Sequence, residues 1–292
     1  MKFAIVDVFA ESAYTGNQLA VFTCPTPLPT EEMQRIAREI NFSESVFIQA
    51  EAGRTGGWDA RIFTPAHEVE FAGHPTLGAA HIIRRDLMST PSRSVHLHFK
   101  AGTVPVTFSP DRDGPLWMQQ IAPVFGETFP TAILADILGL PSEAIDDRFP
   151  IQEVSTGLPH ILVPLRSLDF LRQARVDRPA YFRFIERTWA NNILIFCLQG
   201  RNANHQVSVR MFADYLGIAE DPATGSGNGC LAGYLVKHRC LGRTEIDIVS
   251  GQGHEIDRPS LLFLQAEARA EGISIRVGGR VVDVAAGQWH RI

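Results

Sequence analysis

Two carboxylates and one histidine in this sequence stand beside short segments of small residues. Glu44 interrupts the start of an apolar strand, where partial burial would raise the pKa of its carboxyl and allow proton exchange near neutrality. His74 stands at the expected N-terminus of a helix, whose positive end favours the neutral imidazole. Asp221 adds a carboxylate at the mouth of a glycine-rich turn. These residues predict acid–base chemistry on a small molecule. The alternatives are a solvated strand edge for Glu44 and a surface loop for His74.

Two segments far apart in the sequence look like variants of one another. Residues 61–80 and residues 210–232 each carry an Arg-apolar-Phe triplet, a short spacer, a Gly-polar pair and a stretch of small residues. The pairs are Gly73-His74 and Gly225-Ser226. Each is expected to open a helix, and a helix N-terminus presents unpaired N–H groups and partial positive charge. We therefore expect the two ends to face one another across a cleft and to bind a small anion. A glycine turn that starts a helix and binds nothing is the alternative.

The elements around these segments are mostly strands. The pattern predicts strands over 58–64 and 207–212, each followed by a helix, over 75–85 and 226–238 respectively. Thr30 is the expected N-cap of an earlier helix. Strands outnumber helices and occur in consecutive runs, which argues against a doubly wound parallel sheet.

Composition narrows the classes of protein. A length of 292 residues suggests about two domains, and 45% hydrophobic with 20% charged residues is ordinary for a globular protein. The net charge is −5 and no basic block exceeds Arg84-Arg85, which argues against nucleic-acid binding. The apolar runs are too short to cross a membrane, and Asp7 interrupts the N-terminal run, which argues against a signal peptide.

Other catalytic and metal-binding patterns are missing from the sequence. Gly225-x-Gly227 is followed by Cys230 where a dinucleotide fingerprint needs a third glycine, and neither a P-loop nor a Gly-x-Ser-x-Gly elbow occurs. His96-x-His98 has no third ligand, so we expect no zinc site. The four cysteines form no Cys-x-x-Cys pair, which indicates a reduced cytoplasmic protein. Cys230 should be packed inside its helix rather than reactive.

Taken together, the segments resemble the PhzF-like isomerase family of phenazine biosynthesis. The combination of Phe-Ala-Gly-His-Pro-Thr-Leu-Gly with Asp-Pro-Ala-Thr-Gly-Ser is highly specific, and the likeness keeps its order from end to end. The matching pieces are residues 6–9, 16–22, 41–45, 61–65, 71–78, 220–226 and 277–279.

This resemblance implies an α+β fold similar to diaminopimelate epimerase. Two pseudo-duplicated domains would each wrap a mixed, barrel-like sheet around a central helix. The expected boundaries are 1–118 plus 278–292 for the N-terminal domain and 119–277 for the C-terminal domain, with the active site in the cleft between them. The resemblance also implies a homodimer that uses no metal and no organic cofactor.

The family likeness implies a role for each candidate residue. Glu44 would take a proton from a carbon of trans-2,3-dihydro-3-hydroxyanthranilate and return it elsewhere on the conjugated system. His74 and Asp221 would hold polar groups of the substrate and assist proton movement, and both should line a cleft rather than a core. Donors around the substrate carboxylate would come from Gly73, Gly225 and Ser226.

Some positions separate this chain from relatives of other chemistry. Related racemases place a cysteine before each glycine turn, and here those positions hold Ala72 and Thr224, so a two-thiol racemase is excluded. Gln18 and Glu70 stand where proline is common, and Glu70 would add negative charge near an anion site. The rival classes are a non-catalytic small-anion binding protein and an amino-acid epimerase without the usual thiols.

Overall fold

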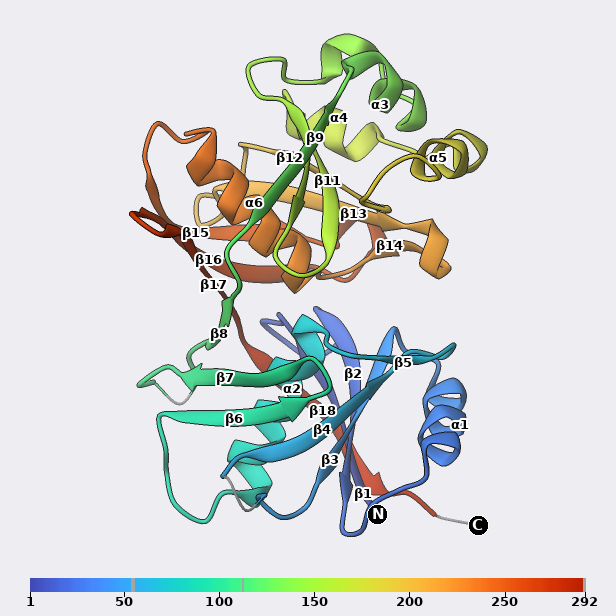
Figure 1. Cartoon of the computed structure of the whole chain (residues 1–292), viewed down its shortest axis with the longest axis vertical. Coiled ribbons are helices and arrows are strands. Elements are labelled where there is room, and N and C mark those ends of the chain that lie inside the picture. Colours follow the sequence, from blue (N-terminus) through green and yellow to red (C-terminus); the bar gives the residue numbers. More distant parts are fainter. Residues whose placement is uncertain (54–55, 112, 291–292) are drawn as a thin grey trace. The chain divides into compact units, whose positions relative to one another are not determined.

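The chain divides into two units, each built from a mixed sheet and one enclosed helix (Figure 1). The structure, a computed structural model, describes residues 1–53, 56–111 and 113–290. Unit 1 contains Met1–Gln119 and the C-terminal segment from Gly278, and unit 2 contains Gln120–Val277. Residues 291–292 of the expected N-terminal domain lie outside the described part of the chain.

The sheet of unit 1 mixes parallel and antiparallel pairs. β18 pairs with β1, β1 with β2 and β3 with β4 in antiparallel fashion, while β2 lies parallel to β3. β4 then pairs antiparallel with the short β5 and parallel with β6, and β6, β7 and β8 follow in antiparallel order. The strands are β1 (Lys2–Val8), β2 (Asn17–Cys24), β3 (Glu44–Gln49), β4 (Trp58–Phe63), β5 (Glu68–Val69), β6 (Ser94–Phe99), β7 (Gly102–Phe108), β8 (Leu116–Gln120) and β18 (Val281–Gln288).

Unit 2 repeats this pairing pattern strand by strand. β9, β10 and β11 are antiparallel, β11 is parallel to β12, and β12 and β14 both pair antiparallel with β13. β13 is parallel to β15, which pairs antiparallel with β16. The strands are β9 (Val124–Phe129), β10 (Ile151–Ser155), β11 (Pro159–Leu165), β12 (Asn192–Cys197), β13 (Val207–Ala213), β14 (Ile218–Asp221), β15 (Glu245–Gln252), β16 (Ser260–Arg269) and β17 (Gly272–Gly279). The duplication seen in the sequence thus extends to the order and direction of the strands.

Each unit encloses one helix, α2 (Gly73–Ile82) in unit 1 and α6 (Gly225–Lys237) in unit 2. Every residue of α2 except His81 is buried, and α6 leaves only Ser226 and Lys237 less than fully buried. A helix buried on all sides must be built from small and apolar residues, which both sequences provide. α2 contacts β1, β2, β3, β6, β7 and β18, and α6 contacts β10, β11, β15 and β16. This confirms the predicted α+β class, with two similar mixed sheets, each around a central helix.

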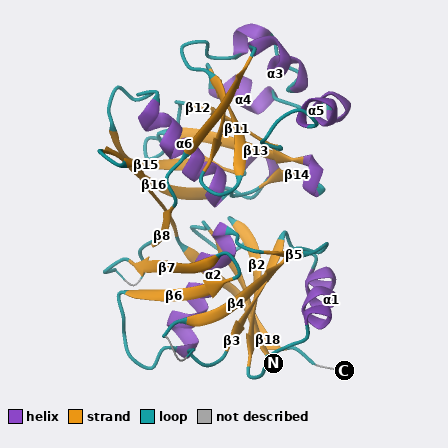
Figure 2. Ribbon diagram, viewed as in Figure 1, coloured by secondary structure: helices purple, strands orange, loops and turns teal. Residues whose placement is uncertain are grey.

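The remaining helices lie outside the sheets, which dominate both units (Figure 2). α1 (Thr30–Ile40) covers one core cluster of unit 1 through Met33, Ile36 and Ala37. The outer helices of unit 2 cover a second core cluster. They are α3 (Thr131–Ile137), α4 (Leu168–Gln173) and α5 (Arg178–Ile185). Unit 2 also has short helical turns at η2 (Ser142–Ala144), η3 (Asp214–Leu216) and η4 (His254–Ile256), and in unit 1 the turn η1 (Ile83–Leu87) follows α2.

One predicted cap is wrong. Thr30 is the first residue of α1, the N-cap position is Pro29, and no side chain caps the helix. The Thr30 hydroxyl instead accepts a hydrogen bond from Arg61 Nη2 at 3.0 Å. A long-range cation therefore uses the oxygen that a local pattern assigns to the helix end.

Candidate active site

The start of β3 and the first turn of α2 bring Glu44 and His74 together in unit 1. Glu44 Oε2 lies 3.6 Å from His74 Nε2, and the side chains are 20% and 6% exposed. Parallel pairing of β2 with β3, which sets Leu19 opposite Glu44, fixes where the carboxylate emerges. This distance is longer than a normal hydrogen bond. It is nevertheless short enough for the two groups to exchange a proton after a small movement.

Burial keeps the His74 imidazole neutral. Desolvation lowers its pKa from 6.5 to about 3, while a hydrogen bond with the backbone of Gln18 opposes the shift. The expected neutral form is therefore favoured, but the main cause is burial rather than the helix end. A neutral imidazole has one N–H donor and one acceptor nitrogen, so it can hold a polar substrate group without adding charge.

The N-terminus of α2 begins where the chain turns from an extended Ala72. That N-cap residue has φ −152° and ψ 145°, and no side chain caps the helix. The early N–H groups of a helix have no partner within the helix, so those of Gly73 and His74 lie at its positive end. Glu44, Gly73 and His74 thus occupy one small region of unit 1.

A parallel arrangement in unit 2 joins Asp221 to the first turn of α6. Asp221 ends β14 and is 7% exposed. Thr224, the N-cap residue, donates its hydroxyl to Asp221 Oδ2 at 2.5 Å instead of capping the helix. The N–H groups of Gly225 and Ser226 therefore begin the helix without a side-chain cap, as Gly73 and His74 do in unit 1. Asp221, Gly225 and Ser226 form the second cluster of candidate residues.

His74 and Asp221 are both largely buried. Each retains less than a tenth of its exposed surface. Their polar groups meet few water molecules, so neighbouring hydrogen bonds determine how they act.

A partly buried amide network holds the first turn of α6. Gln120 Nε2 donates to the carbonyl of Gly225 at 3.0 Å, and Gln120 Oε1 accepts from Thr156 Oγ1 at 2.6 Å. A Cβ at Gly229 would lie 1.8 Å from Gln120 Oε1. The absence of a side chain at Gly229 therefore leaves room for the Gln120 amide.

Next to this network, Cys230 and His160 are both fully buried. Burial raises the pKa of the Cys230 thiol to about 12 and lowers the pKa of His160 to about 4. Cys230 is packed, as predicted, and is poorly suited to act as a thiolate nucleophile. The His160 Nδ1 donates to the carbonyl of Leu158 at 2.9 Å, which fixes the ring orientation.

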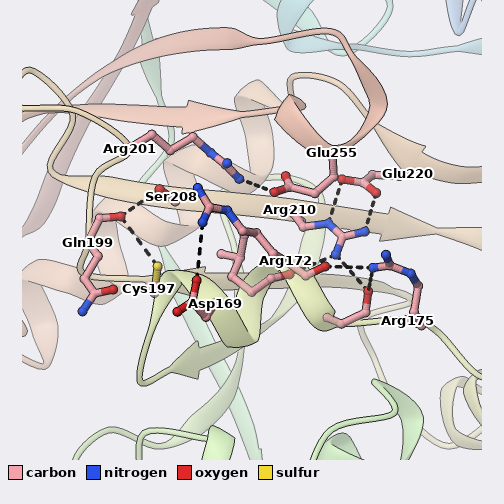
Figure 3. Close-up of polar contacts among 12 residues, drawn as sticks. Asp169, Arg172, Arg175, Cys197, Gln199, Arg201, Ser208, Arg210, Glu220 and Glu255 are labelled. Atoms are coloured by element: carbon pink, nitrogen blue, oxygen red, sulfur yellow. Dashed lines mark hydrogen bonds and ion pairs between the residues drawn. The ribbon is translucent and has the colours of Figure 1, made fainter.

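The repeated Arg-apolar-Phe triplets anchor both glycine turns. Arg210 binds Glu220 through two hydrogen bonds in the polar cluster of Figure 3, and Arg61 binds Glu68 in the same bidentate way. Each arginine also stacks over a phenylalanine two positions later, at 5.0 Å over Phe212 and 5.2 Å over Phe63. Each glutamate stands five residues before the glycine that opens the helix (68 to 73 and 220 to 225).

Other residues singled out in the sequence have structural partners. Glu70 is exposed and lies 3.9 Å from Lys100 Nζ, so a cation offsets its charge. His98 contacts Thr103 Oγ1 at 2.8 Å and the carbonyl of Gly56 at 2.7 Å. Among the described residues, no group of three or more His, Cys, Asp or Glu side chains is arranged to hold a metal ion.

Sequence reasoning missed the polar residues that support the two turns. Glu68 and Glu220 lie five residues before the glycines that open the helices, whereas Gln120 and Gln252 are remote in sequence from the turn that they support. The available signal for Glu68 and Glu220 was their equal spacing to Gly73 and Gly225. Gln252, at the buried end of β15, gave no such signal.

Comparison with known proteins assigns the family. The family model for phenazine biosynthesis-like proteins (PhzC-PhzF) matches residues 6–287. The chain belongs to this family. The trans-2,3-dihydro-3-hydroxyanthranilate isomerase of Pseudomonas fluorescens is 36% identical over 295 residues, covering 98% of both chains. Isomerase relatives at this level support an isomerase function for this PhzF-family chain.

Solved structures agree with the family and the fold. A PhzF-family protein from Bacillus anthracis superposes with a TM-score of 0.89 at 26% identity, covering 98% of both chains. A probable proline racemase from Agrobacterium radiobacter reaches a TM-score of 0.65 at 11% identity, covering 99% of this chain and 92% of its own. The second likeness concerns the fold alone. Within the described part of this PhzF-family chain, the helices are too short or too polar to cross a membrane.

Proposed function

We propose that this protein is a cofactor-independent isomerase that moves a proton on a small cyclic amino carboxylate, with Glu44 as the general acid–base. The relatives named trans-2,3-dihydro-3-hydroxyanthranilate isomerase point to that compound, or one closely similar to it, as the substrate. The observation that carries the proposal is the 3.6 Å approach of Glu44 Oε2 to His74 Nε2 beside the first turn of α2.

In the proposed reaction, the ionised Glu44 carboxylate removes a proton from a substrate carbon. The electron pair of the broken C–H bond enters the conjugated system and places negative charge on the substrate. Protonated Glu44 then delivers the proton to another carbon of that system, so atoms and charge balance with no external oxidant or base. Neutral His74 would hold a polar substrate group during the transfer.

The same proposal gives the second cluster a binding role. The N–H groups of Gly73 at α2, and of Gly225 with Ser226 at α6, would donate to the substrate carboxylate and to the charge that develops during proton transfer. Asp221 would bind an amino or hydroxyl group.

Hydrogen exchange in deuterated water tests the proposal. The unmodified protein and a Glu44→Gln variant would be incubated with trans-2,3-dihydro-3-hydroxyanthranilate, and deuterium at carbon would be followed by mass spectrometry. Glu44→Gln keeps the shape but cannot act as a base, so exchange should fall at least ~100-fold. Exposed Glu39→Gln on α1 is the matched control and should exchange normally.

Two outcomes would contradict the isomerase. One is equal exchange by both Glu44 forms. The other is tight binding of cyclic amino carboxylates by the unmodified protein with no exchange at carbon, which would favour a non-catalytic anion-binding protein.

A further inference from the structure

Gln252 uses its whole amide on the turn that precedes α6. Its Nε2 donates to the carbonyl of Asp221 at 2.8 Å and to Thr224 Oγ1 at 2.9 Å. Its Oε1 accepts from the backbone N–H of Thr224 at 3.1 Å and from Asn228 Nδ2 at 2.8 Å. The side chain is fully buried. Both amide protons and two acceptor positions are therefore satisfied by this turn and by Asn228 in α6.

Two backbone partners fix which way the amide points. A carbonyl can only accept and a backbone N–H can only donate, so the nitrogen must face the Asp221 carbonyl and the oxygen must face the Thr224 N–H. The usual ambiguity between amide oxygen and nitrogen is absent here. Gln252 Nε2 is thus a donor to the Thr224 hydroxyl.

The fixed amide sets the direction of the next hydrogen bond. Because Thr224 Oγ1 accepts from Gln252, its own hydrogen is left for Asp221 Oδ2, which lies 2.5 Å away. In this arrangement Asp221 Oδ2 is the acceptor and the Thr224 hydroxyl is the donor. The chain of donors runs in one direction, from Gln252 through Thr224 to Asp221.

We propose that Gln252 and Thr224 are positioning residues for the isomerase reaction, which orient the Asp221 carboxylate and keep it an acceptor toward the substrate. This inference rests on the proposed role of Asp221 in substrate binding. It assigns a specific task to position 224, directly before the glycine turn, where related racemases carry a reacting cysteine. Here the Thr224 side chain does not react but orients the Asp221 carboxylate through a hydrogen bond.

Three variants separate this role from simple packing. Thr224→Val keeps the shape of the side chain and removes the hydroxyl, whereas Thr224→Ser keeps the hydroxyl. Gln252→Glu keeps the acceptor atoms and removes the donor. We expect Thr224→Val to lower kcat for deuterium exchange ~10- to 100-fold with KM changed less than ~3-fold, and Thr224→Ser to recover kcat to within ~3-fold of the unmodified protein.

A double variant tests whether the two residues act in series. If Gln252 acts through the Thr224 hydroxyl, the loss of kcat in Thr224→Val plus Gln252→Glu should be much smaller than the product of the single losses. Should the buried carboxylate of Gln252→Glu prevent folding, the Thr224 pair alone decides the matter. Unchanged kcat in Thr224→Val, or equal losses in the Val and Ser variants, would overturn the inference.

A spectroscopic measurement keeps this inference distinct from the proposed function. In nitrogen-15 NMR spectra, both side-chain amide protons of Gln252 should exchange slowly with solvent, and Thr224→Val should speed the exchange of one of them. Fast exchange of both protons in the unmodified protein would contradict the network itself. Slow exchange in a protein without isomerase activity would retain the network and reject the role assigned to Asp221.

Discussion

Arg210 holds both carboxylate oxygens of Glu220, with Nε 3.0 Å from Oε1 and Nη2 2.8 Å from Oε2. The pair is buried, at 5% and 8% side-chain exposure, and the second Nη atom donates to the carbonyls of Leu171 and Ala174. The ion pair therefore connects β13 and β14 to the end of α4. Its glutamate, Glu220, directly precedes Asp221 in the sequence.

Removing one partner of this ion pair should destabilise the protein strongly. Glu220→Gln leaves the Arg210 cation buried beside a neutral group, and we expect the free energy of unfolding to fall by about 3–5 kcal/mol. Glu68→Gln breaks the equivalent pair with the more exposed Arg61 and should cost about 1 kcal/mol or less. Urea denaturation measures both losses, and equal losses would show that burial does not distinguish the two pairs.

Asp221 and His74 should matter more for turnover than for folding. Asp221→Asn and His74→Gln conserve most of the side-chain volume, so the melting temperature should drop by less than about 10 °C. Turnover should fall about 10²- to 10⁴-fold, since each group would contact the substrate. Deuterium exchange and a thermal melt on the same samples test this. A large drop in melting temperature with little change in turnover would assign both residues to structure alone.

Buried neutral histidines should make stability depend on pH. His74 and His160 have folded pKa values of about 3 and about 4, below the ordinary 6.5. Between each folded pKa and pH 6.5, the unfolded chain binds protons that the folded chain does not. The stabilisation from keeping these histidines neutral is therefore complete above about pH 6.5 and is lost as the pH falls. Each histidine should contribute a slope of up to about 1.4 kcal/mol per pH unit.

Denaturation between about pH 5 and pH 7 measures this slope. His160→Asn can retain a donor toward the Leu158 carbonyl. It should remove about one proton from the difference in proton binding between the unfolded and folded states, and so lower the slope. An unchanged slope in that variant would mean that His160 is already protonated in the folded protein at these pH values.

Gly229 should not tolerate alanine, despite the helical propensity of that residue. Alanine alone would favour a helix by about 1 kcal/mol, but its Cβ would displace the Gln120 amide from Gly225 and Thr156. We expect a net loss of about 1–2 kcal/mol in the free energy of unfolding. In a Gln120→Ala background the same substitution should be neutral or stabilising. A Gly229→Ala protein as stable as the parent would show that the amide moves without cost.

Thiol reagents should leave activity intact. The Cys230 thiol is buried and its pKa is raised to about 12, so almost none is thiolate at neutral pH. Iodoacetamide treatment and a Cys230→Ala variant should both retain exchange activity within about 3-fold. Rapid inactivation by the reagent, prevented in Cys230→Ala, would point instead to thiol chemistry.

Local patterns in the sequence predicted much of the fold. The strands before each glycine turn and the two enclosed helices follow from short-range periodicity and small residues, and α2 and α6 begin close to the expected positions. The short strand β14 has the sequence Ile-Ala-Glu-Asp, which offers too few apolar residues to indicate a strand. Its place is set instead by Glu220, through the ion pair with Arg210.

The candidate residues could be named from sequence, but their supports could not. Glu44 and His74 stand in motifs, whereas Gln252 gains its role from partners 24 to 31 positions away. Hydrogen bonds of this span depend on how strands pair, which no local pattern encodes. The same holds for Thr30, whose hydroxyl binds a distant arginine instead of its own helix.

The two units share one strand order. A chain that contains the same strand order twice can place different side chains at equivalent positions of its two halves while both halves keep one fold. The anchors Glu68 and Glu220 have the same spacing to Gly73 and Gly225, whereas the residues after these glycines differ, a histidine (His74) and a serine (Ser226). Such division of labour allows a new reaction to arise without a new scaffold.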